Sequence, residues 1–408
     1  MKKMEMGITG FLVICILCFT NNAYAIAPDK ILSYHIKEAD GTSSQDTNSG
    51  SGIKTAHIQD GAVTDAKISG PISADKIAVA NVIVVAKSGG QFTSPVDAIN
   101  SISGASAAHP YLVKVMPGVY NLGDASLPLK PYVYLEGSGR ENTTITSSVN
   151  NVDFDTCAEG TIIMANNSSI RHIGIGNVAP DEGNQNMAQA VVVNNVDAFI
   201  EDVTIRVGDN TIYSGRNNGL CATGDTGHAR LNNVDIEVLT MGGHANAVIV
   251  GDGADMTINN SNLVARPGDG IDTSTHVVDC YNYFVYDAVS HVVINNSYIE
   301  STDENASTGW FSALWMNDCI STITNSTIRT THTNSSESCG IDDYNGRFTM
   351  LNSQIYVAPG EYNRPLCVSD YIDKGKVANS LIQGPIAEGT NVKLLNNYDE
   401  NLNVIPNQ

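Results

Sequence analysis

The stretch His228–Ile236 reads HARLNNVDI, and seven stretches of the chain follow the same pattern. Each is a short alternation of polar and apolar residues, then Asn or Asp, a small or apolar residue, one variable residue, and a closing Ile or Leu. The stretches are Asp197–Ile205, His228–Ile236, Asp255–Leu263, His291–Ile299, Ile320–Ile328, Arg347–Ile355 and Lys374–Ile382. Their closing residues recur every 27 to 36 residues, and two fainter copies end at Ile145 and Ile175. A period of this length indicates stacked supersecondary units.

Within each copy, apolar residues lie seven, five and zero positions before the end, as at Ala229, Leu231 and Ile236. Alternation with period two is typical of a half-buried strand. It breaks at the Asn, a residue that tolerates the left-handed backbone of a corner. The sequence therefore predicts an all-β fold, a single-stranded right-handed parallel β-helix in which each corner amide can hydrogen-bond the next. The predicted corner ladder is Asn233, Asn260, Asn296, Asn325, Asn352 and Asn379, preceded by Asp202.

A leucine-rich or helical repeat is the competing interpretation. Leu is scarce in the copies, the strands are β-branched, and no ten-residue window has the apolar stripe of an amphipathic helix. The 36 Gly and 6% aromatic residues fit many short strands joined by turns. We expect the β-helix over residues 81–395 and a C-terminal tail over residues 396–408.

Residues 1–25 have the form of a secretory signal peptide. Lys2 and Lys3 give the positive start, Phe11–Phe19 the apolar core, and Ala23–Ala25 the small-residue cleavage site. The apolar core is too short to span a bilayer, and no later segment is long enough. We expect a bacterial protein that is secreted or held at the cell surface, with the periplasm as the alternative.

The formal net charge is −21, and it is about one unit more negative without the signal. A chain without a basic stripe is a poor ligand for nucleic acid, because it cannot replace phosphate counterions. An acidic polysaccharide would need a bridging cation. Solubility alone also explains the charge.

Six cysteines remain after the signal, and they allow up to three disulfides in an exported protein. They are Cys157, Cys221, Cys280, Cys319, Cys339 and Cys367. Cys319 and Cys339 lie about one short coil apart, so we expect this pair to be bridged. Free buried thiols are the alternative.

Residues 26–80 differ from the rest in composition. Asp40–Ser51 is a polar linker, and three eight-residue repeats follow it over residues 51–77. These repeats resemble the stalk repeats of bacterial surface proteins and phage tail fibres. The resemblance implies lateral association into a homotrimer through residues 51–78, and docking of this segment onto the β-helix is the alternative.

The segment Asn81–Ile145 resembles the opening coils of the pectin lyase-like superfamily, and of its pectin methylesterases in particular. The matching stretches are Val84–Phe92, Val96–Asn100 and Val115–Tyr120. From the residues themselves, Ser94 and Pro95 begin a helix that runs to about Ser103. Such a helix would cap the exposed end of the first coil.

The resemblance extends to weaker catalytic candidates. Gln189–Val193 is similar to the Gln-Ala-Val strand of those esterases, which implies that Gln189 helps to stabilise an oxyanion. Asp209 stands near the position of their general acid, and Arg266-Pro267 near that of their Gly-Arg-Pro-Trp motif. The Asp of the nucleophile motif is missing from Ala247–Gly251, the segment near its place. Two carboxylates and an Arg are the minimum for this hydrolysis, so the site is incomplete.

Two further enzyme templates on this fold are not met. Polysaccharide lyases need calcium-binding carboxylates and a base, and polygalacturonases need three Asp with His and an Arg-x-Lys motif. Asp342-Asp343 is the only adjacent Asp pair in a coil loop, and Arg-x-Lys does not occur. We therefore expect no cofactor, with calcium as the alternative.

Asp197, His228, Asp255 and His291 stand eight positions before four successive closing residues. Strand alternation points this column outward, so coils in register would form a row of carboxylates and imidazoles. Such a row could hold a transition metal. The simpler interpretation, which we prefer, is a solvent-facing ladder of complementary charges.

The longest interval between copies, from Leu263 to Ile299, carries an insertion with acidic and aromatic residues. Long loops usually carry the binding face of a solenoid, and aromatic rings offer flat platforms for sugars. The alternative is that these rings pack beneath their own loop. The predicted ligand-binding residues are Asp269, Asp272, Tyr281, Tyr283, Trp310 and Trp315.

The function that the sequence favours is non-catalytic. We expect an exported protein of the cell surface or extracellular matrix that binds a polysaccharide, a surface glycan or a partner protein. The alternative is a divergent polysaccharide-active enzyme, either an esterase or a lyase. The fold alone cannot choose between the two, because one scaffold hosts both.

Overall fold

In a computed structural model the chain divides into two compact units, Met1–Ile72 and Ser73–Gln408. The structure describes residues 81–151, 157–178, 187–208, 215–240, 243–267, 274–282, 288–302, 309–332, 337–360, 362–368, 375–386 and 392–407. The predicted signal peptide, linker and stalk repeats lie outside the described residues. Among the described helices, none is long and apolar enough to cross a membrane.

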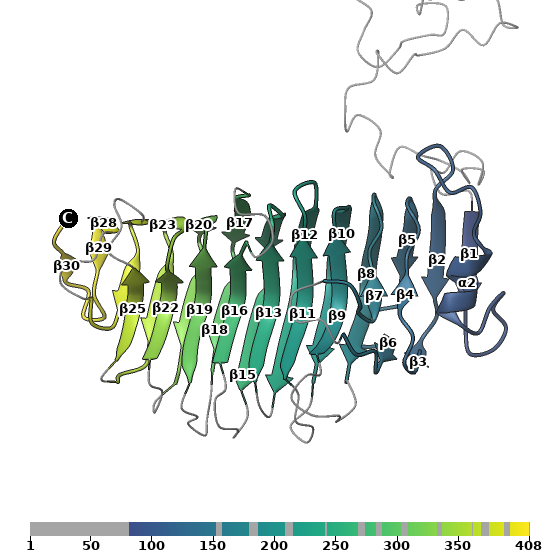
Figure 1. The fold of residues 1–408 in the computed structure, drawn as a ribbon, viewed down its shortest axis with the longest axis horizontal. Helices are drawn as coiled ribbons and strands as arrows, with labels where there is room; N and C mark the ends of the chain where they lie inside the picture. Colours follow the sequence, from purple (N-terminus) through teal and green to yellow (C-terminus); the bar gives the residue numbers. More distant parts are fainter. Residues whose placement is uncertain are drawn as a thin grey trace, which may run out of the picture. The chain divides into compact units, whose positions relative to one another are not determined.

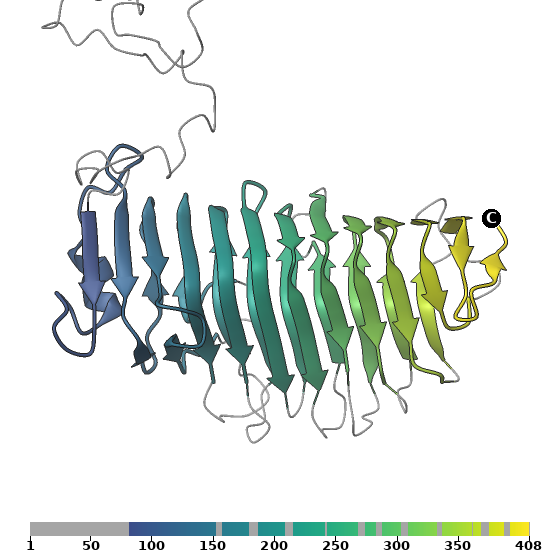
Figure 2. The ribbon, with the colours of Figure 1, turned by 180° about the vertical axis from the view of Figure 1, so that it is seen from behind.

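The second unit is a parallel β-solenoid, and each complete coil contributes three strands (Figure 1; Figure 2). Strands before the corner form what we call the first face: β1 Asn81–Val85, β2 Tyr111–Val115, β5 Val133–Glu136, β8 Ser168–Asn177, β10 Asp197–Val207, β12 His228–Thr240, β14 Asp255–Asn259, β17 Ser290–Asn295, β20 Cys319–Thr324, β23 Arg347–Leu351, β26 Gly375–Ala378 and β28 Val392–Leu395. β8, β10 and β12 continue through the corner.

Strands after the corner form the second face, which belongs to the same 21-stranded sheet. They are β3 Gly118–Asn121, β6 Thr143–Ser147, β15 Asn262–Pro267, β18 Tyr298–Ser301, β21 Thr327–Thr330, β24 Gln354–Val357, β27 Leu381–Gln383, β29 Asn397–Tyr398 and β30 Val404–Ile405. The third face is a separate nine-stranded sheet. It contains β4 Leu127–Pro128, β7 Ile162–Ile163, β9 Met187–Asn194, β11 Arg216–Thr223, β13 His244–Gly251, β16 Ser274–Tyr281, β19 Trp310–Asn317, β22 Glu337–Asp343 and β25 Asn363–Val368.

The repeat template fixes the register of these coils. Ala229, Leu231 and Ile236 are at most 1% exposed, and they align with Met256, Ile258 and Leu263 of the next coil. Every predicted corner residue has a positive φ between 50° and 55°. The predicted parallel β-solenoid is therefore confirmed, with corners at the residues that the pattern indicated.

The hydrogen bonds at the corners differ from the expected chain of corner amides. Asn233 donates to Asp202 at 2.9 Å, but Asn260 donates to Asn232, one position before the corner. A column of residues at that earlier position bonds from coil to coil, as Asn295 does to Asn259 at 2.9 Å. The corner residues supply the left-handed backbone, and the outward neighbours supply the amide ladder.

A buried serine ladder follows the corners and was not predicted. The N–H of Ser261 donates to Ser297 Oγ at 3.1 Å, and the N–H of Ser297 donates to Ser326 Oγ at the same distance. Each hydroxyl also donates to the carbonyl two residues earlier, as Ser297 does to Asn295 at 2.8 Å. These bonds satisfy backbone groups that the turn removes from the sheet ladder. The members are Ser261, Ser297, Ser326, Ser353 and Ser380, and Asn397 ends the series.

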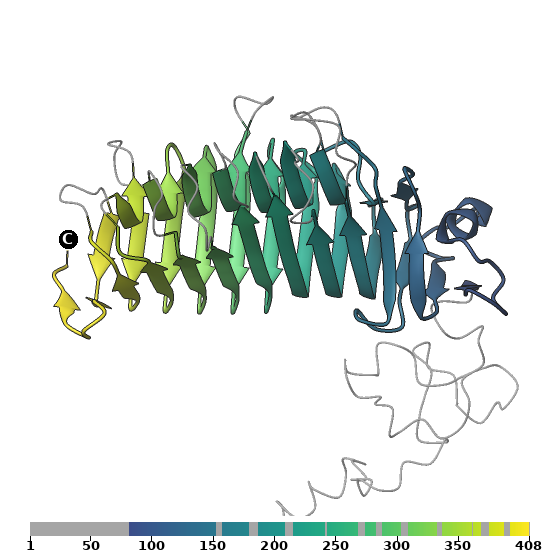
Figure 3. The same ribbon diagram turned by 90° about the horizontal axis from the view of Figure 1, so that it is seen from below.

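A helix packs at the N-terminal end of this unit (Figure 3). Helix α2, Pro95–Ser101, lies against β1, β2 and β4 and buries Ala98 and Ile99. Ser94 caps it by accepting from the N–H of Asp97 at 3.3 Å. The predicted start is confirmed, and the helix ends two residues before Ser103. At the other end, β29 and β30 pair antiparallel within the segment predicted as a tail.

Three disulfides link the six cysteines as Cys157–Cys221, Cys280–Cys319 and Cys339–Cys367. The predicted bond between Cys319 and Cys339 is wrong. Cys319 begins β20 on the first face, whereas Cys339 lies within β22 on the third face. The two residues are 20 positions apart, which is less than a complete coil of at least 27 residues, so they fall on different faces and each bonds another cysteine.

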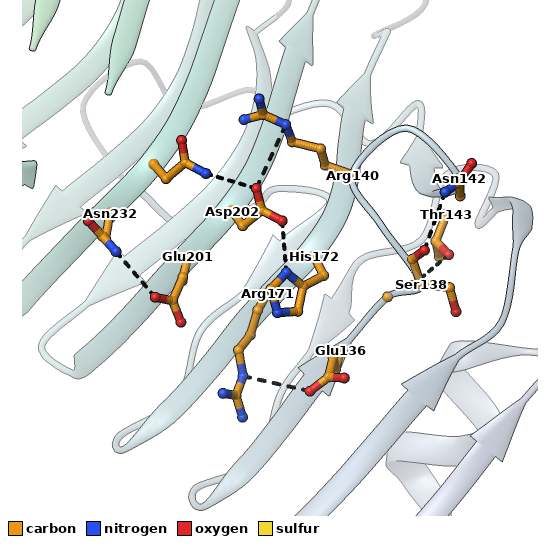
Figure 4. Close-up of polar contacts among 12 residues, drawn as sticks. Glu136, Ser138, Arg140, Asn142, Thr143, Arg171, His172, Glu201, Asp202 and Asn232 are labelled. Atoms are coloured by element: carbon orange, nitrogen blue, oxygen red, sulfur yellow. Dashed lines mark hydrogen bonds and ion pairs between the residues drawn. The ribbon is translucent and has the colours of Figure 1, made fainter. Parts of the chain in front are cut away.

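Ion pairs surround the N-terminal end of the corner column (Figure 4). His172 Nδ1 lies 2.8 Å from Asp202 Oδ2, and Arg140 lies 2.9 Å from Asp235 and 3.8 Å from Asp202. All four side chains are partly exposed, so each pair contributes about 1 kcal/mol or less. The network ties the loop that carries Arg140 to three successive coils.

Candidate functional site on the third face

The outer surface of the nine-stranded sheet carries an unusual column of side chains. Asp279 on β16, Trp315 on β19 and Asp342 on β22 occupy the same register on adjacent strands. Toward the N-terminus the column continues with Ile249 and Cys221. The column is thus apolar at Cys221 and Ile249, and farther along it has two carboxyl groups, one on each side of the Trp315 indole.

Both carboxyl groups are poorly solvated. Asp279 is 3% exposed, and burial raises its pKa to about 7, although the cationic Arg216 opposes the shift. Burial also raises the pKa of Asp342 to about 7, with help from Glu337 and Asp343. Within the described residues, Oδ1 of Asp279 and Oδ2 of Asp342 are buried without a hydrogen-bond partner. Burial disfavours the ionised form of such groups, and carboxyls with pKa values shifted in this way are frequent at functional sites.

Aromatic rings pack around the indole between these carboxyls. The His276 ring stacks on Trp315 with centroids 5.5 Å apart, and the Tyr281 ring lies 6.1 Å away at a tilt. His276 Nδ1 is 2.6 Å from Ser312 Oγ, which fixes the orientation of the ring. Burial, followed by the charges of His244 and Arg216, lowers the pKa of His276 to about 3. The imidazole is therefore neutral in ordinary buffers.

A small pocket lies beside this column toward the N-terminus. Its walls include Asn218, Thr223, Asp252 and the Cys157–Cys221 disulfide. Gln189 also lines it and is fully buried, and neither amide atom has a hydrogen-bond partner in the described part of the chain. Since burying an unpaired amide is costly, this side chain is suited to a polar ligand.

The structure separates the catalytic candidates that the family resemblance implied. Gln189 lies on the third face, whereas Arg266 lies on β15 of the second face, 3.2 Å from Glu237. Asp209 lies outside the described residues. Gln189 and Arg266 therefore do not share a site.

The predicted aromatic site is only partly visible. Asp269, Asp272 and Tyr283 lie outside the described residues. Trp310 and Trp315 both lie on β19, five residues and about 16 Å apart along the strand. Trp310 is 51% exposed, while Trp315 packs with Tyr281. The two indoles belong to different patches and do not form one platform.

The predicted outward row lies on the first face, away from the carboxyl column. His228 Nδ1 is 3.0 Å from Asp197, His228 Nε2 is 3.2 Å from Asp255, and His291 Nδ1 is 2.9 Å from Asp255. Exposed fractions of these side chains range from 42% to 48%. The row is thus solvated and internally paired.

The sequence did not single out Asp279. Asp342 was noted only as half of an adjacent pair, and His276 only as part of the long insertion. The signal that could have revealed Asp279 is its position within the otherwise apolar run VVDCY, Val277–Tyr281. That Asp279 lines up with Asp342 on β22 can be seen only from the strand register of the third face.

Comparison with known proteins finds fold neighbours. No family profile matches the sequence, and no curated protein matches it. A pectin methylesterase from carrot is 15% identical, with 76% of this chain and 85% of that chain covered and a TM-score of 0.37. The pectin methylesterase PemA from Erwinia chrysanthemi is 14% identical, with 80% and 91% covered and a TM-score of 0.34.

A further neighbour is the A-module of the mannuronan C-5 epimerase AlgE4 from Azotobacter vinelandii. It is 14% identical, with 75% of this chain and 89% of that chain covered and a TM-score of 0.41. Identities and TM-scores this low do not indicate which reaction, if any, the chain catalyses. The structures that resemble this chain thus include pectin methylesterases and a mannuronan C-5 epimerase module.

Proposed function

We propose that the protein is a polysaccharide-active enzyme that uses acid–base catalysis on the outer surface of the third face. The observation that carries this proposal is the register of Asp279, Trp315 and Asp342, in which two dehydrated carboxyls flank one indole. The proposal therefore favours the enzymatic alternative over the non-catalytic function that the sequence favoured.

The spacing of the carboxyls suits cleavage of a glycosidic bond. Strands in a sheet lie about 4.8 Å apart, so the backbones of Asp279 and Asp342 are about 10 Å apart. Hydrolysis with inversion uses an acid and a base whose carboxyls are about 6.5–9.5 Å apart, which leaves room for a water molecule. A raised pKa lets one carboxyl stay protonated near neutral pH and act as the acid, while the other acts as the base.

The surroundings favour a neutral polysaccharide over a uronate. Glu337, Asp342 and Asp343 gather at one end of the column, and Arg216 is the cation that acts on Asp279. The negative charge of these carboxylates would repel an anionic sugar. One sugar ring would stack on Trp315 between the two carboxyls, on the side of the indole that His276 does not cover.

Non-catalytic carbohydrate binding is the second candidate. It is favoured by Trp310, which is 51% exposed. An isolated exposed aromatic ring is a common sugar contact, but it needs no dehydrated carboxyls nearby. Binding that survives the loss of Asp279 and Asp342 would support this candidate.

A panel of neutral, uronate and methyl-esterified polysaccharides would test the proposal. We expect new reducing ends from a neutral polymer, without absorbance at 235 nm from uronate elimination and without methanol release. Asp279→Asn and Asp342→Asn should each abolish the product. Asp225→Asn makes the same chemical change at an exposed turn and should have no effect. The proposal fails if no polymer yields product or if both site variants keep full activity.

A further inference from the structure

The pocket beside the carboxyl column brings two buried amide side chains together. Gln189 on β9 aligns with Asn218 on the adjacent strand β11, and both residues line the pocket. Gln189 is fully buried and Asn218 is 1% exposed. The free volume of the pocket is about 10 Å³, which is just enough for one water-sized group. Two amides therefore face a space that admits a single small polar group.

Both amides have unused capacity for hydrogen bonds. Among the described residues, neither Oε1 nor Nε2 of Gln189 has a hydrogen-bond partner. The side chain of Asn218 lies 3.1 Å from the amide of Asn246 and 3.1 Å from the sulfur of Met187, which is a weak partner. A buried polar group without a good partner lowers stability, so a ligand that pairs with these amides gains free energy by binding.

A hydroxyl group matches this pocket better than a carboxylate or a methyl group does. A hydroxyl can donate to Oε1 of Gln189 and accept from an amide N–H in the same pocket. A carboxylate only accepts, so Oε1 would stay unpaired, and Asp252, which also lines the pocket, would repel it. A methyl group would leave both polar atoms of Gln189 unpaired.

The walls of the pocket favour a hydroxyl that stands clear of the sugar ring. Met187, Ile249 and the Cys157–Cys221 disulfide line the pocket beside the amides. A hydroxymethyl group carries its oxygen one carbon beyond the ring. Its carbon can therefore contact the apolar walls while its oxygen reaches the amides. A hydroxyl attached directly to the ring reaches less far.

The pocket lies close enough to the carboxyl column to serve the same bound polymer. Ile249 lines the pocket and aligns with Asp279 on the next strand. Tyr281 also lines the pocket, and the centroid of its ring lies 6.1 Å from that of Trp315. Since β13 and β19 are two strands apart, about 10 Å separates Ile249 from the indole. A sugar chain that crosses the strands would place one unit on Trp315 and another unit at the pocket.

We propose, on the basis of the proposed function, that this pocket is a subsite for the primary hydroxyl group of a hexose, and that Gln189 determines this specificity. Asn218 supplies the second amide. The substrate class then narrows from neutral polysaccharides to polymers of hexoses with a free primary hydroxyl. Uronates, pentoses and deoxy sugars lack this group and leave Gln189 unpaired. This role differs from the stabilisation of an oxyanion that the family resemblance implied.

Calorimetric titration with short oligosaccharides of glucose, mannose and galactose tests the subsite. The full mature protein carries Asp342→Asn in every titration, so that the oligomers are not cleaved. We expect at least one oligomer to bind more tightly than two matched forms of it, by roughly tenfold or more. In the deoxy form hydrogen replaces each primary hydroxyl, and in the uronate form a carboxylate replaces each hydroxymethyl group.

Gln189→Met, a change to an apolar side chain of similar size, should remove this preference. It should also leave the urea midpoint of unfolding as high as in the parent protein or higher, because it removes an unpaired buried amide. A glutamine with only a structural role would instead lose stability on substitution. Gln354→Met is the matched control, because Gln354 is exposed on β24 of the second face, and it should change neither the preference nor the midpoint.

Equal affinity for the three forms of every oligomer would overturn the proposal without reference to any variant, and so would the absence of binding at millimolar concentration. A preference that survives in Gln189→Met would also overturn it. The same oligomers separate this proposal from the proposed function. A preference for the primary hydroxyl without product from any polymer would refute the catalytic function and keep the subsite, whereas product without this preference would do the reverse.

Discussion

The first and third faces present two rows of ionisable side chains built by the same register rule. On the first face, carboxylates and an imidazole alternate at Asp197, His228 and Asp255, contact one another and remain about half exposed. On the third face, Asp279 and Asp342 have the same sign, are separated by Trp315, and are largely buried. Because the coils are stacked in register, equivalent side chains form rows on every face of the solenoid. Whether a row becomes chemically unusual depends on burial and on the sign of its neighbours.

The largest expected difference between the two faces is in catalysis. Asp279→Asn and Asp342→Asn should lower kcat by about 10²–10⁴-fold, since each removes a proton donor or acceptor. Asp197→Asn on the first face should leave kcat unchanged. Steady-state kinetics on the polymer that yields product would measure this, and equal losses from the two faces would contradict the assignment.

The two buried carboxyls of the third face should contribute to the pH dependence of stability. The pKa values of Asp279 and Asp342 rise to about 7 in the folded chain, from about 4 when unfolded. Between these values the folded chain holds protons that the unfolded chain releases. The contribution of these two carboxyls to the free energy of unfolding therefore falls as pH rises from about 4 to about 7, by up to about 4 kcal/mol per carboxyl, whereas the lowered pKa values of the buried His244, His276 and His332 act in the opposite direction.

Urea unfolding at several pH values would measure this slope. Replacing either Asp with Asn should remove the fall that this carboxyl contributes between pH 4 and pH 7, and it should stabilise the protein at pH 8, because a neutral amide has no charged form to bury. Asp225→Asn should keep the slope of the wild type. If the Asp279→Asn/Asp342→Asn double variant had the same pH dependence as the wild type, the two carboxyls would contribute nothing to it.

The serine ladder should matter more than its small side chains suggest. Ser297→Ala leaves the N–H of Ser261 without its acceptor inside the solenoid, which should cost about 1–3 kcal/mol. Ser103→Ala, at an exposed loop position, should cost almost nothing. Equal midpoints of chemical unfolding for the two variants would show that the ladder contributes no stability.

The corners should show a smaller effect. Asn296 has φ near 50°, so Asn296→Ala should cost about 1 kcal/mol and Asn296→Gly less. Thermal unfolding would rank the three proteins. An alanine variant as stable as the glycine variant would mean that the left-handed backbone costs an L-residue little at this corner.

The smallest effect is expected in the outward row Asp197, His228, Asp255 and His291 on the first face. His291→Ala removes a half-exposed pair with Asp255 and should change stability by a few tenths of a kcal/mol. Added salt should reduce even that difference. A loss of more than about 2 kcal/mol would show that the row is a structural element and not a solvated ladder.

Periodicity sufficed to predict the coils, because Ile236 and Leu263 recur with the spacing that a solenoid core demands. It also located Asn233 and the other corner residues, since few residue types accept a positive φ. It missed the serine ladder because a small residue after the corner looked interchangeable with an apolar one. It misassigned Cys319, because the loops between the faces vary in length and hide which cysteines meet.

The candidate site was less accessible to sequence reasoning. Asp279 and Asp342 lie 63 positions apart, and their shared register depends on every intervening loop. Their burial arises from packing around the third face, which no local pattern reports. Gln189 was found through a family resemblance, but its expected partner Arg266 lies on another face. The motifs shared with pectin methylesterases thus predicted the coils but not which side chains lie together in one site.

The carboxyl titration of Asp279 and Asp342 is the most direct test. ¹³C NMR of the mature protein with aspartate labelled at Cγ would follow every carboxyl from pH 3 to pH 9. We predict two resonances that titrate near pH 7, one absent from Asp279→Asn and the other from Asp342→Asn. If every aspartate instead titrates below about pH 5, the third face holds ordinary ionised carboxylates and the proposed acid–base site does not exist.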